Sequence, residues 1–512
     1  MRRRIGAIAC AAAAAIALAA CGGGGADSTD PAALAPSDVP VYFQAKLRPE
    51  GEVKTNTEGL VQTISGGQTV QDLIDRAVDE ANAESSAEDI SFEGDINPWL
   101  GDNAGAFISD ITGDSPHAAG VIETTDEGAT QDFIDKAREK GDQDREYEGV
   151  DYLLDQDTAV GVLDGFLVIG DEQGFKEAVD VSQGGDSLAD NSDFSETIDK
   201  APANSLADAY VGLDAVLQAI EEQSDDPASS QAFKAFFGEA SGKSVLASLV
   251  PQSDSIVVEQ LTNADFGFQP GDVTELIGSF PAESFAAFAV ADVGKLVSRT
   301  LDQLESAGIP GLSRETIDQR LSSAGLSLDE ITGILDDLGL FVEGTTEETV
   351  EGALVITVSN PEKAQDIIGT FSGLAVASGE PGIKRVSGGT GLQISDPDLG
   401  PKPGVLLVAG NRIAVGYGTE ATEQALSTAG GGKTLADSPT FKQATAALGD
   451  DVDLNAYFSV GLITQLAESL GADSDPEYLA ARPYLKRFTY VVSGSGSDGD
   501  DTVTKLVAGV EK

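Results

Sequence analysis

Cysteine and histidine are almost absent from this chain of 512 residues, which has two cysteines, Cys10 and Cys21, and a single histidine, His117. A structural zinc site draws its four ligands mainly from these two residue types, so none is expected. Any Ser-His-Asp or Cys-His catalytic site would have to use His117. That residue follows the turn-like Asp114-Ser115-Pro116, and we interpret it as an exposed loop histidine. No catalytic, cofactor-binding or metal-ligating residue is predicted.

Positive charge is also scarce, because 31 basic residues face 86 acidic ones and the formal net charge is −55. Nucleic-acid binding depends on Lys and Arg that neutralise phosphates, so a nucleic-acid partner is excluded. A large net charge also favours a soluble monomer. Acidic clusters such as Asp142 to Glu148 lack the EF-hand spacing, and we interpret them as solvated surface.

The N-terminus has the three parts of a secretory signal, which we assign to residues 1–20. Three arginines precede an apolar stretch from Ile5 to Leu18 that is too short to span a membrane. Leu18-Ala19-Ala20-Cys21 follows and resembles the lipobox of bacterial lipoprotein precursors. The resemblance implies that the Cys21 thiol receives a diacylglyceryl group, with palmitate-type chains, and becomes the first residue. The chain would then be anchored to the cell membrane on its extracytoplasmic face, without any disulfide.

A flexible tether is predicted for residues 21–36, because Gly22 to Gly25 are followed by Asp, Ser, Thr and Pro. The rest of the chain contains a long internal repeat. Matching segments keep their order at offsets of 234 to 247 residues: Gly105 matches Gly339, Phe107 matches Phe341, and Tyr210 matches Tyr457. Ordered matches over this length predict two homologous tandem halves, residues 37–275 and 276–512.

Each half combines hairpin signals with helix signals in the same order. The first hairpin turns at Asp164-Gly165 and the second at Gly410-Asn411. Alternation over Val41 to Leu47 predicts a strand that buries Val41, Phe43, Ala45 and Leu47. Without regular strand–helix alternation, the pattern predicts α+β halves, each a mostly antiparallel sheet with packed helices.

Three further segments have definite predictions. Ser327 and Glu330 have capping-box spacing and predict a helix over 327–338. Asn360 and Pro361 predict the first turn of another helix. The Gly-rich acidic stretch from Ser493 to Asp501 predicts exposed turns.

Trp99 is the only tryptophan. It could line an apolar ligand pocket or pack in the core. Its counterpart in the second half is Ile334, at a position expected to be helical core, so core packing is favoured.

Four segments together resemble an uncharacterised family of exported, lipid-anchored bacterial proteins known only as a domain of unknown function. They are the lipobox, the opening from Pro36 to Tyr42, Leu47-Arg48-Pro49-Glu50-Gly51 and Pro98-Trp99-Leu100-Gly101. The resemblance covers almost the whole mature chain and implies no activity.

These observations favour a non-enzymatic, lipid-anchored protein that binds an unknown ligand or partner. In one version of this hypothesis, the ligand is a hydrophobic molecule held between sheet and helices. A solute-binding lipoprotein of an importer is the first alternative, although a linear duplication fits it poorly. An extracytoplasmic hydrolase is the second.

Overall fold

The computed structural model describes most of the chain after residue 29, and by their contacts these residues form two units. Unit 1 comprises the described residues through Ala264, and unit 2 those from Gly271 to Glu511. The signal peptide and Cys21 lie outside the described residues, which are 30–83, 89–111, 116–139, 141–214, 216–218, 242–264, 271–306, 313–322, 325–386, 389–426 and 432–511.

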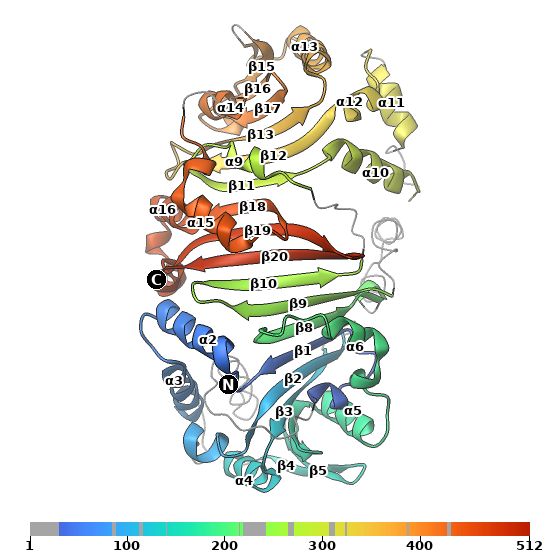
Figure 1. Cartoon of the computed structure of the whole chain (residues 1–512), viewed down its shortest axis with the longest axis vertical. Helices are drawn as coiled ribbons and strands as arrows, with labels where there is room; N and C mark the ends of the chain where they lie inside the picture. Colours follow the sequence, from blue (N-terminus) through green and yellow to red (C-terminus); the bar gives the residue numbers. More distant parts are fainter. Residues whose placement is uncertain are drawn as a thin grey trace. The chain divides into compact units, whose positions relative to one another are not determined.

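The described strands of unit 1 form one antiparallel sheet (Figure 1). Each strand bonds to the next in the order β10 (Ser255–Thr262), β9 (Ser244–Pro251), β8 (Ala207–Gly212), β1 (Val41–Lys46), β2 (Leu100–Asp110), β3 (His117–Thr124), β7 (Phe166–Asp171), β6 (Thr158–Leu163), β5 (Val150–Asp155), β4 (Gln143–Tyr147). The hairpin predicted at Asp164-Gly165 joins the antiparallel neighbours β6 and β7, as a two-residue turn requires.

The described strands of unit 2 are paired in the same way. Their order is β20 (Asp501–Val510), β19 (Phe488–Asp498), β18 (Asp453–Ser459), β11 (Ser284–Val290), β12 (Leu335–Glu343), β13 (Glu351–Val358), β17 (Arg412–Tyr417), β16 (Gly404–Ala409), β15 (Thr390–Ile394), β14 (Ile383–Arg385).

The register of the two sheets agrees at residues that the sequence repeat aligns. Tyr42 in β1 lies opposite Phe107 in β2. Ala287 in β11 lies opposite Phe341 in β12. The two units therefore share strand order and register, and their common origin by duplication stays a prediction.

Helices cover both faces of the unit 1 sheet and enclose two apolar cores. On one face lie α2 (Gly51–Ile64), α3 (Val70–Ala83), the π-helical turn η2 (Phe92–Ile96) and α4 (Glu127–Ala137). On the other face lie η1 (Pro31–Leu34), α5 (Glu172–Ser182), η3 (Leu188–Asp190) and α6 (Ser192–Ile198). In Figure 1, α2 and α3 lie on the opposite side of the strands from α5 and α6. The predicted α+β class with packed helices is confirmed.

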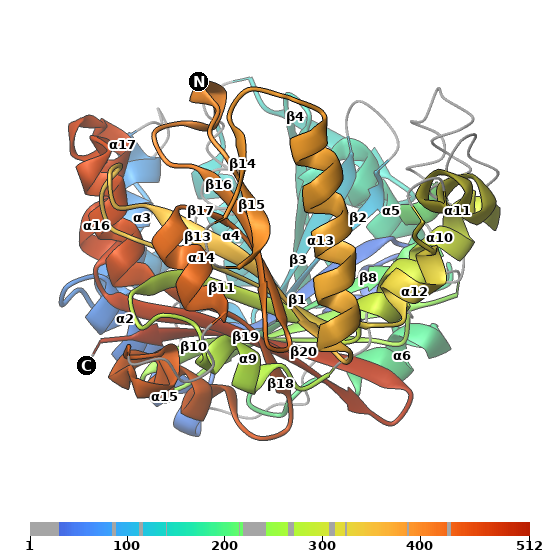
Figure 2. The same ribbon diagram turned by 90° about the horizontal axis from the view of Figure 1, so that it is seen from above.

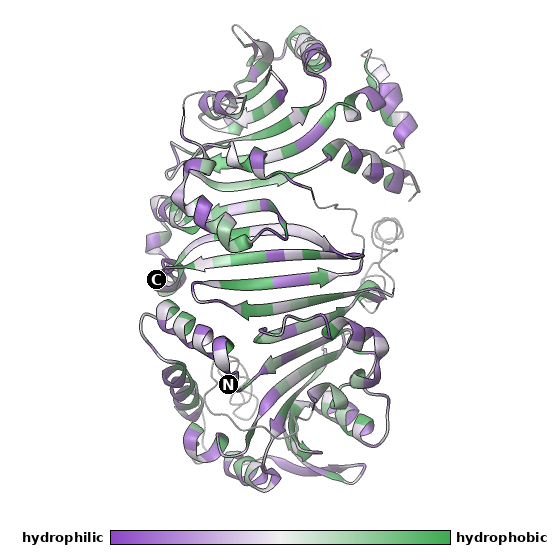
Figure 3. Ribbon diagram, in the orientation of Figure 1, coloured by the Kyte–Doolittle hydropathy of each residue, from purple (hydrophilic) through white to green (hydrophobic). Residues whose placement is uncertain are grey.

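In unit 2 the long helix α13 (Pro361–Ala377) packs on β14, β15 and β16 (Figure 2). Figure 3 shows hydrophobic residues concentrated on the strands, whereas α11 (Arg314–Ser322) is mostly hydrophilic and buries no residue. The other described helices of unit 2 are α9 (Thr274–Gly278), α10 (Val293–Ser306), α11 (Arg314–Ser322), α12 (Leu328–Thr332), η5 (Pro397–Leu399), α14 (Thr419–Leu426), η6 (Leu435–Asp437), α15 (Pro439–Leu448), α16 (Val460–Ser469), η7 (Ala472–Ser474) and α17 (Pro476–Leu485). The boundary that the sequence suggests after residue 275 falls inside α9.

The predicted hairpin turns and the predicted helix cap at Asn360 are confirmed. In each, the conformation depends on a local property of one or two residues: a positive φ angle in the turns, and a side-chain hydrogen bond to the backbone in the cap. Asp164 and Gly165 take φ values of 48° and 81° in the β6–β7 hairpin. Gly410 takes φ 54° in the β16–β17 hairpin. Asn360 caps α13 by accepting a hydrogen bond from the Lys363 N–H at 3.0 Å.

The helix predicted over 327–338 is wrong beyond Thr332. The helix α12 ends there, and β12 begins at Leu335. Ser327 makes no side-chain cap hydrogen bond. The six residues from Gly333 to Leu338 lead into and form the start of β12, which pairs with both β11 and β13, so the sheet overrides the local helix signal.

The exposed turns predicted from Ser493 to Asp501 are wrong as far as Asp498, where β19 ends, and are confirmed only at Gly499 and Asp500, an exposed turn between β19 and β20. Within β19, glycine is required by close packing rather than by a turn. A Cβ on Gly494 would come within 2.7 Å of the Asp453 carbonyl oxygen, and one on Gly496 within 2.6 Å of the Asp451 carbonyl oxygen.

The tether predicted for residues 21–36 ends earlier than expected. Residues Pro31–Leu34 form η1, capped by the Asp30 carboxylate, which accepts from the Ala32 N–H at 2.9 Å. Ala32 and Leu34 are buried in the core with α5. Local composition suggested a linker, but this segment contributes apolar side chains to the core.

The buried face predicted for β1 is wrong at its centre. Tyr42 is fully buried, whereas Phe43 is 46% exposed. Tyr42 packs edge-on against Phe194 with ring centroids 5.4 Å apart. Alternating apolar residues indicate that a strand is present. Which of its two faces is buried depends on where the neighbouring helices pack.

Candidate functional site

A cavity of about 590 Å³ lies in unit 1 among α2, α3 and η2. Four buried apolar side chains form its floor: Val70, Ile74, Phe92 and Leu100. The rest of its lining is polar or charged apart from one glycine, and comprises Arg48, Thr55, Glu58, Gly59, Gln62, Thr69, Gln71, Glu93 and Asn97. An apolar floor below a polar mouth is the usual composition of a small-molecule site.

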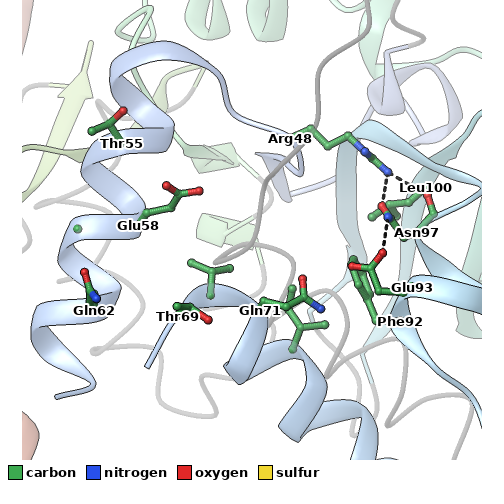
Figure 4. Close-up of a pocket in the computed structure, with 13 residues that line it drawn as sticks. Arg48, Thr55, Glu58, Gln62, Thr69, Gln71, Phe92, Glu93, Asn97 and Leu100 are labelled. Atoms are coloured by element: carbon green, nitrogen blue, oxygen red, sulfur yellow. Dashed lines mark hydrogen bonds between the residues drawn. The ribbon is translucent and has the colours of Figure 1, made fainter. Parts of the chain in front are cut away.

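Helix geometry places the polar side chains of α2 on one face. Thr55, Glu58 and Gln62 are spaced three and four residues apart, so they share a stripe on the helix surface. All three line the cavity, and Figure 4 shows Glu58 pointing from α2 toward the space between that helix and Arg48. The opposite face of α2 buries Leu60 and Val61.

A chain of hydrogen bonds fixes the wall across from α2 (Figure 4). Arg48 Nη2 donates to the Asn97 backbone oxygen at 3.0 Å and to Asn97 Oδ1 at 2.8 Å. Asn97 Nδ2 in turn donates to Glu93 Oε2 at 3.2 Å. The guanidinium is thus held in place, with Glu58 and Glu93 the other charged groups in the lining.

The start of α3 forms the lower edge of the cavity. Thr69 Oγ1 accepts from the Asp72 N–H at 3.1 Å, and the Asp72 carboxylate accepts from the Thr69 N–H at 2.7 Å. This reciprocal cap satisfies two backbone donors at the helix start. The hydrogen bonds from Thr69 lower the pKa of Asp72, so the cap is intact at neutral pH.

Trp99 belongs to the core beside the cavity. It is 2% exposed, its Nε1 donates to the Asp95 carbonyl oxygen at 2.7 Å, and its ring lies 5.4 Å from that of Phe133. The cavity lining includes its neighbour Leu100 instead. Ile334, its counterpart in unit 2, is also buried, but it follows α12 rather than lying in a helix.

His117 is the first residue of β3 rather than a loop residue. Its Nδ1 lies 3.0 Å from Asp171 Oδ1. The same carboxylate accepts from the Ala118 N–H and caps α5 through the N–H groups of Gln173 and Gly174. Asp171 therefore joins β3 to the start of α5, and His117 lies at the edge of that structural contact.

The acidic stretch from Asp142 to Glu148 lies at and beside the edge strand β4. Asp144 pairs with Arg138, and Asp142 accepts from the Glu139 N–H at 2.7 Å. Within the described ranges, no group of three or more His, Cys, Asp or Glu side chains is arranged to hold a metal ion. Among the same residues, no helix combines the length and apolar character needed to span a bilayer.

The structure brings together two segments that carry the family resemblance in the sequence. Arg48 comes from the 47–51 segment and Leu100 from the 98–101 segment, and both line the cavity. The α2 and α3 residues of the lining were missed. Their only sequence signal was helical spacing of polar residues, which equally describes a solvent-exposed helix face.

Fold and site define this chain as an α+β protein with antiparallel sheets and a ligand-sized cavity beneath helices. The chain belongs to the family described as "Protein of unknown function (DUF3352)", whose profile matches residues 7–385. No curated protein matches it.

Solved structures of one protein, TP0453, are similar to part of the chain. Crystal form IV covers 46% of this chain and 81% of its own length, at 11% identity and a TM-score of 0.27. Crystal form I covers 54% and 87%, at 11% identity and a TM-score of 0.26. TM-scores this low do not establish a shared fold.

Proposed function

We propose that this chain is a lipid-anchored, extracytoplasmic protein that binds an amphiphilic molecule and does not catalyse a reaction. The cavity of about 590 Å³ supports the proposal most directly. Its volume falls within the range of about 300–1,000 Å³ typical of small-molecule sites. The family as a whole has no assigned activity.

The lining indicates the chemistry of the ligand. Val70, Ile74, Phe92 and Leu100 would cover an apolar portion. Arg48 contributes one positive charge against the two carboxylates of Glu58 and Glu93, so the lining carries a net charge of about −1. This balance favours an uncharged or zwitterionic polar group over an anionic one.

A second apolar surface lies on the same face of the sheet. Two cross-strand rows of apolar side chains, Ala104–Ala45–Ala207 and Ala106–Phe43–Ala209, line a shallow groove of about 280 Å³. Leu47 belongs both to this groove and to the core that includes Val70, Ile74 and Leu100. The groove would extend the apolar surface available to a long alkyl chain.

Gly59 offers a direct test, because a Cβ added there meets no atom within 4 Å and the residue lines the cavity. Gly59→Leu should fill part of the cavity while stabilising α2 by about 1 kcal/mol through higher helix propensity. We expect native mass spectrometry of the full chain carrying Cys21→Ser to show a co-purifying ligand, which Gly59→Leu loses. Affinity for the neutral probe N-phenyl-1-naphthylamine should fall at least fivefold.

Gly59→Ala is the matched control, since it gives a similar helix stabilisation and fills far less of the space. It should retain the ligand. A ligand-free mass for the parent chain together with equal probe affinity in all three proteins would contradict the proposal.

The anchor is tested separately at Cys21. Cys21→Ser should move the chain from the membrane fraction to the soluble extracytoplasmic fraction with an unchanged melting temperature. Cell fractionation and circular dichroism measure the two effects, and a variant still found with membranes would disprove lipid anchoring.

A further inference from the structure

The helices α16 and α17 of unit 2 leave their apolar side chains partly or fully exposed. α16 packs on β11, β18 and β19, and α17 lies beyond it at the periphery of the unit (Figure 2). Thr464 is the one buried residue of α16, and α17 buries none. A surface helix of a folded protein normally buries its apolar stripe. These helices therefore present an apolar surface that the described part of the chain does not cover.

The apolar residues of α17 form one stripe along the helix. Leu479 and Ala480 are each followed four residues later by Pro483 and Tyr484, so the four side chains share a face. All four are exposed, Leu479 by 45% and Tyr484 by 44%. Because Ala480 is small, another helix can approach the stripe closely at its centre.

The opposite side of α17 is held to α16 by polar contacts. Glu468 Oε1 in α16 accepts from Tyr478 Oη at 3.1 Å and from Arg482 Nε at 2.7 Å, and Lys486 Nζ lies 3.1 Å from the same oxygen. Hydrogen bonds from Lys486 and Arg482 lower the pKa of Glu468, so the carboxylate is ionised at neutral pH. Tyr478 and Arg482 each precede a member of the stripe by two residues, which is roughly 200° around the helix. The network therefore fixes α17 with its apolar stripe turned outward.

The two ends of α17 carry opposite charges, and each sign complements the helix dipole at its end. The acidic residues at its start are Asp473, Asp475 and Glu477, and the basic residues at its end are Arg482, Lys486 and Arg487. The start thus has a charge of about −3, and the end has about +2 after subtraction of the shared Glu468. The stripe lies between these two charged ends.

We propose that α17 is the contact of a symmetric dimer formed with a second copy of this chain. In a twofold arrangement the two copies of α17 would run antiparallel, so that each apolar stripe packs on the other. The acidic end of each helix would then face the basic end of the other, with Glu477 near Arg487 of the second copy. A membrane surface suits this face less well, because the acidic end would also approach the lipid phosphates.

The dimer is expected to be weak. A contact between single helices is smaller than a standard protein interface of about 1,600 Å². The formal net charge of −55 also opposes association. At physiological ionic strength the Debye length is about 8 Å, so distant charges are screened and those at the contact dominate. We expect a dissociation constant in the micromolar range, and anchoring on one membrane would raise the effective concentration of the copies.

The test is sedimentation equilibrium at physiological ionic strength. It uses the chain from residue 21 onward with Cys21→Ser, which has neither the apolar leader nor a lipid. We expect a reversible monomer–dimer equilibrium. Ala480→Glu places a charge at the centre of the stripe and should weaken dimerisation at least tenfold. Ala446→Glu changes an exposed alanine of α15 and is the matched control, which should leave the dissociation constant unchanged.

Charge reversal tests the antiparallel arrangement. Glu477→Lys would place two basic residues together at each end of the contact, and Arg487→Glu would place two acidic residues together. Each variant alone should therefore dimerise at least fivefold more weakly than the parent. An equimolar mixture of the two restores an opposite-charge pair at both ends and should recover the dimer. All four positions that are changed in these tests are exposed, and circular dichroism verifies that each variant is folded.

A parent chain that stays monomeric at all concentrations would overturn the proposal. So would equal dimerisation of Ala480→Glu, or a mixture of the charge-reversed variants that stays monomeric. Vesicles of phosphatidylcholine and phosphatidylglycerol test the membrane directly. If they bind a monomeric parent and Ala480→Glu abolishes that binding, the surface belongs to a membrane contact instead. Because the tested chain has no lipid, none of these results depends on acylation of Cys21 or on a ligand in the cavity.

Discussion

Replacing Trp99 with alanine is expected to lower the free energy of unfolding by about 3–5 kcal/mol. The indole is 2% exposed and packs in the core formed by α3, η2 and α4, with its ring 5.4 Å from that of Phe133. Its removal would leave a large void and also leave the Asp95 carbonyl oxygen without its donor, now at 2.7 Å. Urea denaturation followed by circular dichroism measures the loss.

Ile334→Ala is the comparison variant in unit 2. Ile334 is the repeat counterpart of Trp99 and is 9% exposed in a separate core. It should cost about 2–4 kcal/mol, because a smaller side chain is removed. If Trp99→Ala destabilised the protein by less than 1 kcal/mol, Trp99 would not be a core residue and a ligand-facing role would regain support.

Glu343→Gln is expected to stabilise the protein at pH 8 and to have little effect at pH 4.5. Glu343 ends β12 directly opposite Glu351 in β13. Burial, followed by the charges of Glu351, Glu420 and Glu283, raises the pKa of Glu343 from 4.5 to about 7. Lys402 opposes this only in part, because its Nζ pairs with Glu351 at 3.0 Å.

The sign follows from the raised pKa in the folded state. Below pH 4.5 the carboxyl is protonated in both the folded and the unfolded chain, and it costs nothing. As the pH rises toward 7, the unfolded chain ionises first and stability is lost. Above pH 7 the full cost is present, about 1–3 kcal/mol after allowance for screening of a partly buried group.

The measurement is the melting temperature of both proteins from pH 4.5 to 8. All 86 acidic residues add a general pH dependence, so the difference between variant and parent is the informative quantity. Glu347→Gln removes an exposed charge from the loop between the same two strands and serves as the control. A stabilisation equal in both variants, or one that does not change with pH, would contradict the raised pKa of Glu343.

The candidate site was predictable only in part. The stretches around Arg48 and Leu100 stood out in the sequence through their resemblance to a family, and both line the cavity. Nothing in the sequence showed that Thr55, Glu58 and Gln62 line the same cavity. Residues 48 and 100 are brought together because β1, from Val41 to Lys46, pairs with β2 over its full length. Pairing between segments so far apart in the chain leaves no local pattern in the sequence.

The exposed helix α17 shows the same limit more clearly. In the sequence, Leu479, Ala480 and Tyr484 have the spacing of any helix that packs in a core. Only the structure shows that no residue of α17 is buried. Burial is a tertiary property, so composition cannot reveal which apolar residues stay at the surface.

The sequence by itself determined the α+β class, the hairpins at Asp164-Gly165 and Gly410-Asn411, and the cap at Asn360, because each depends on the conformational preference of adjacent residues. Tertiary structure alone decided the outcome where distant segments compete for the same residues. It extended β19 through the Ser-Gly stretch, ended α12 at Thr332, and buried Tyr42 in place of Phe43. In each case strand pairing or helix packing contributed more free energy than the local preference it overrode.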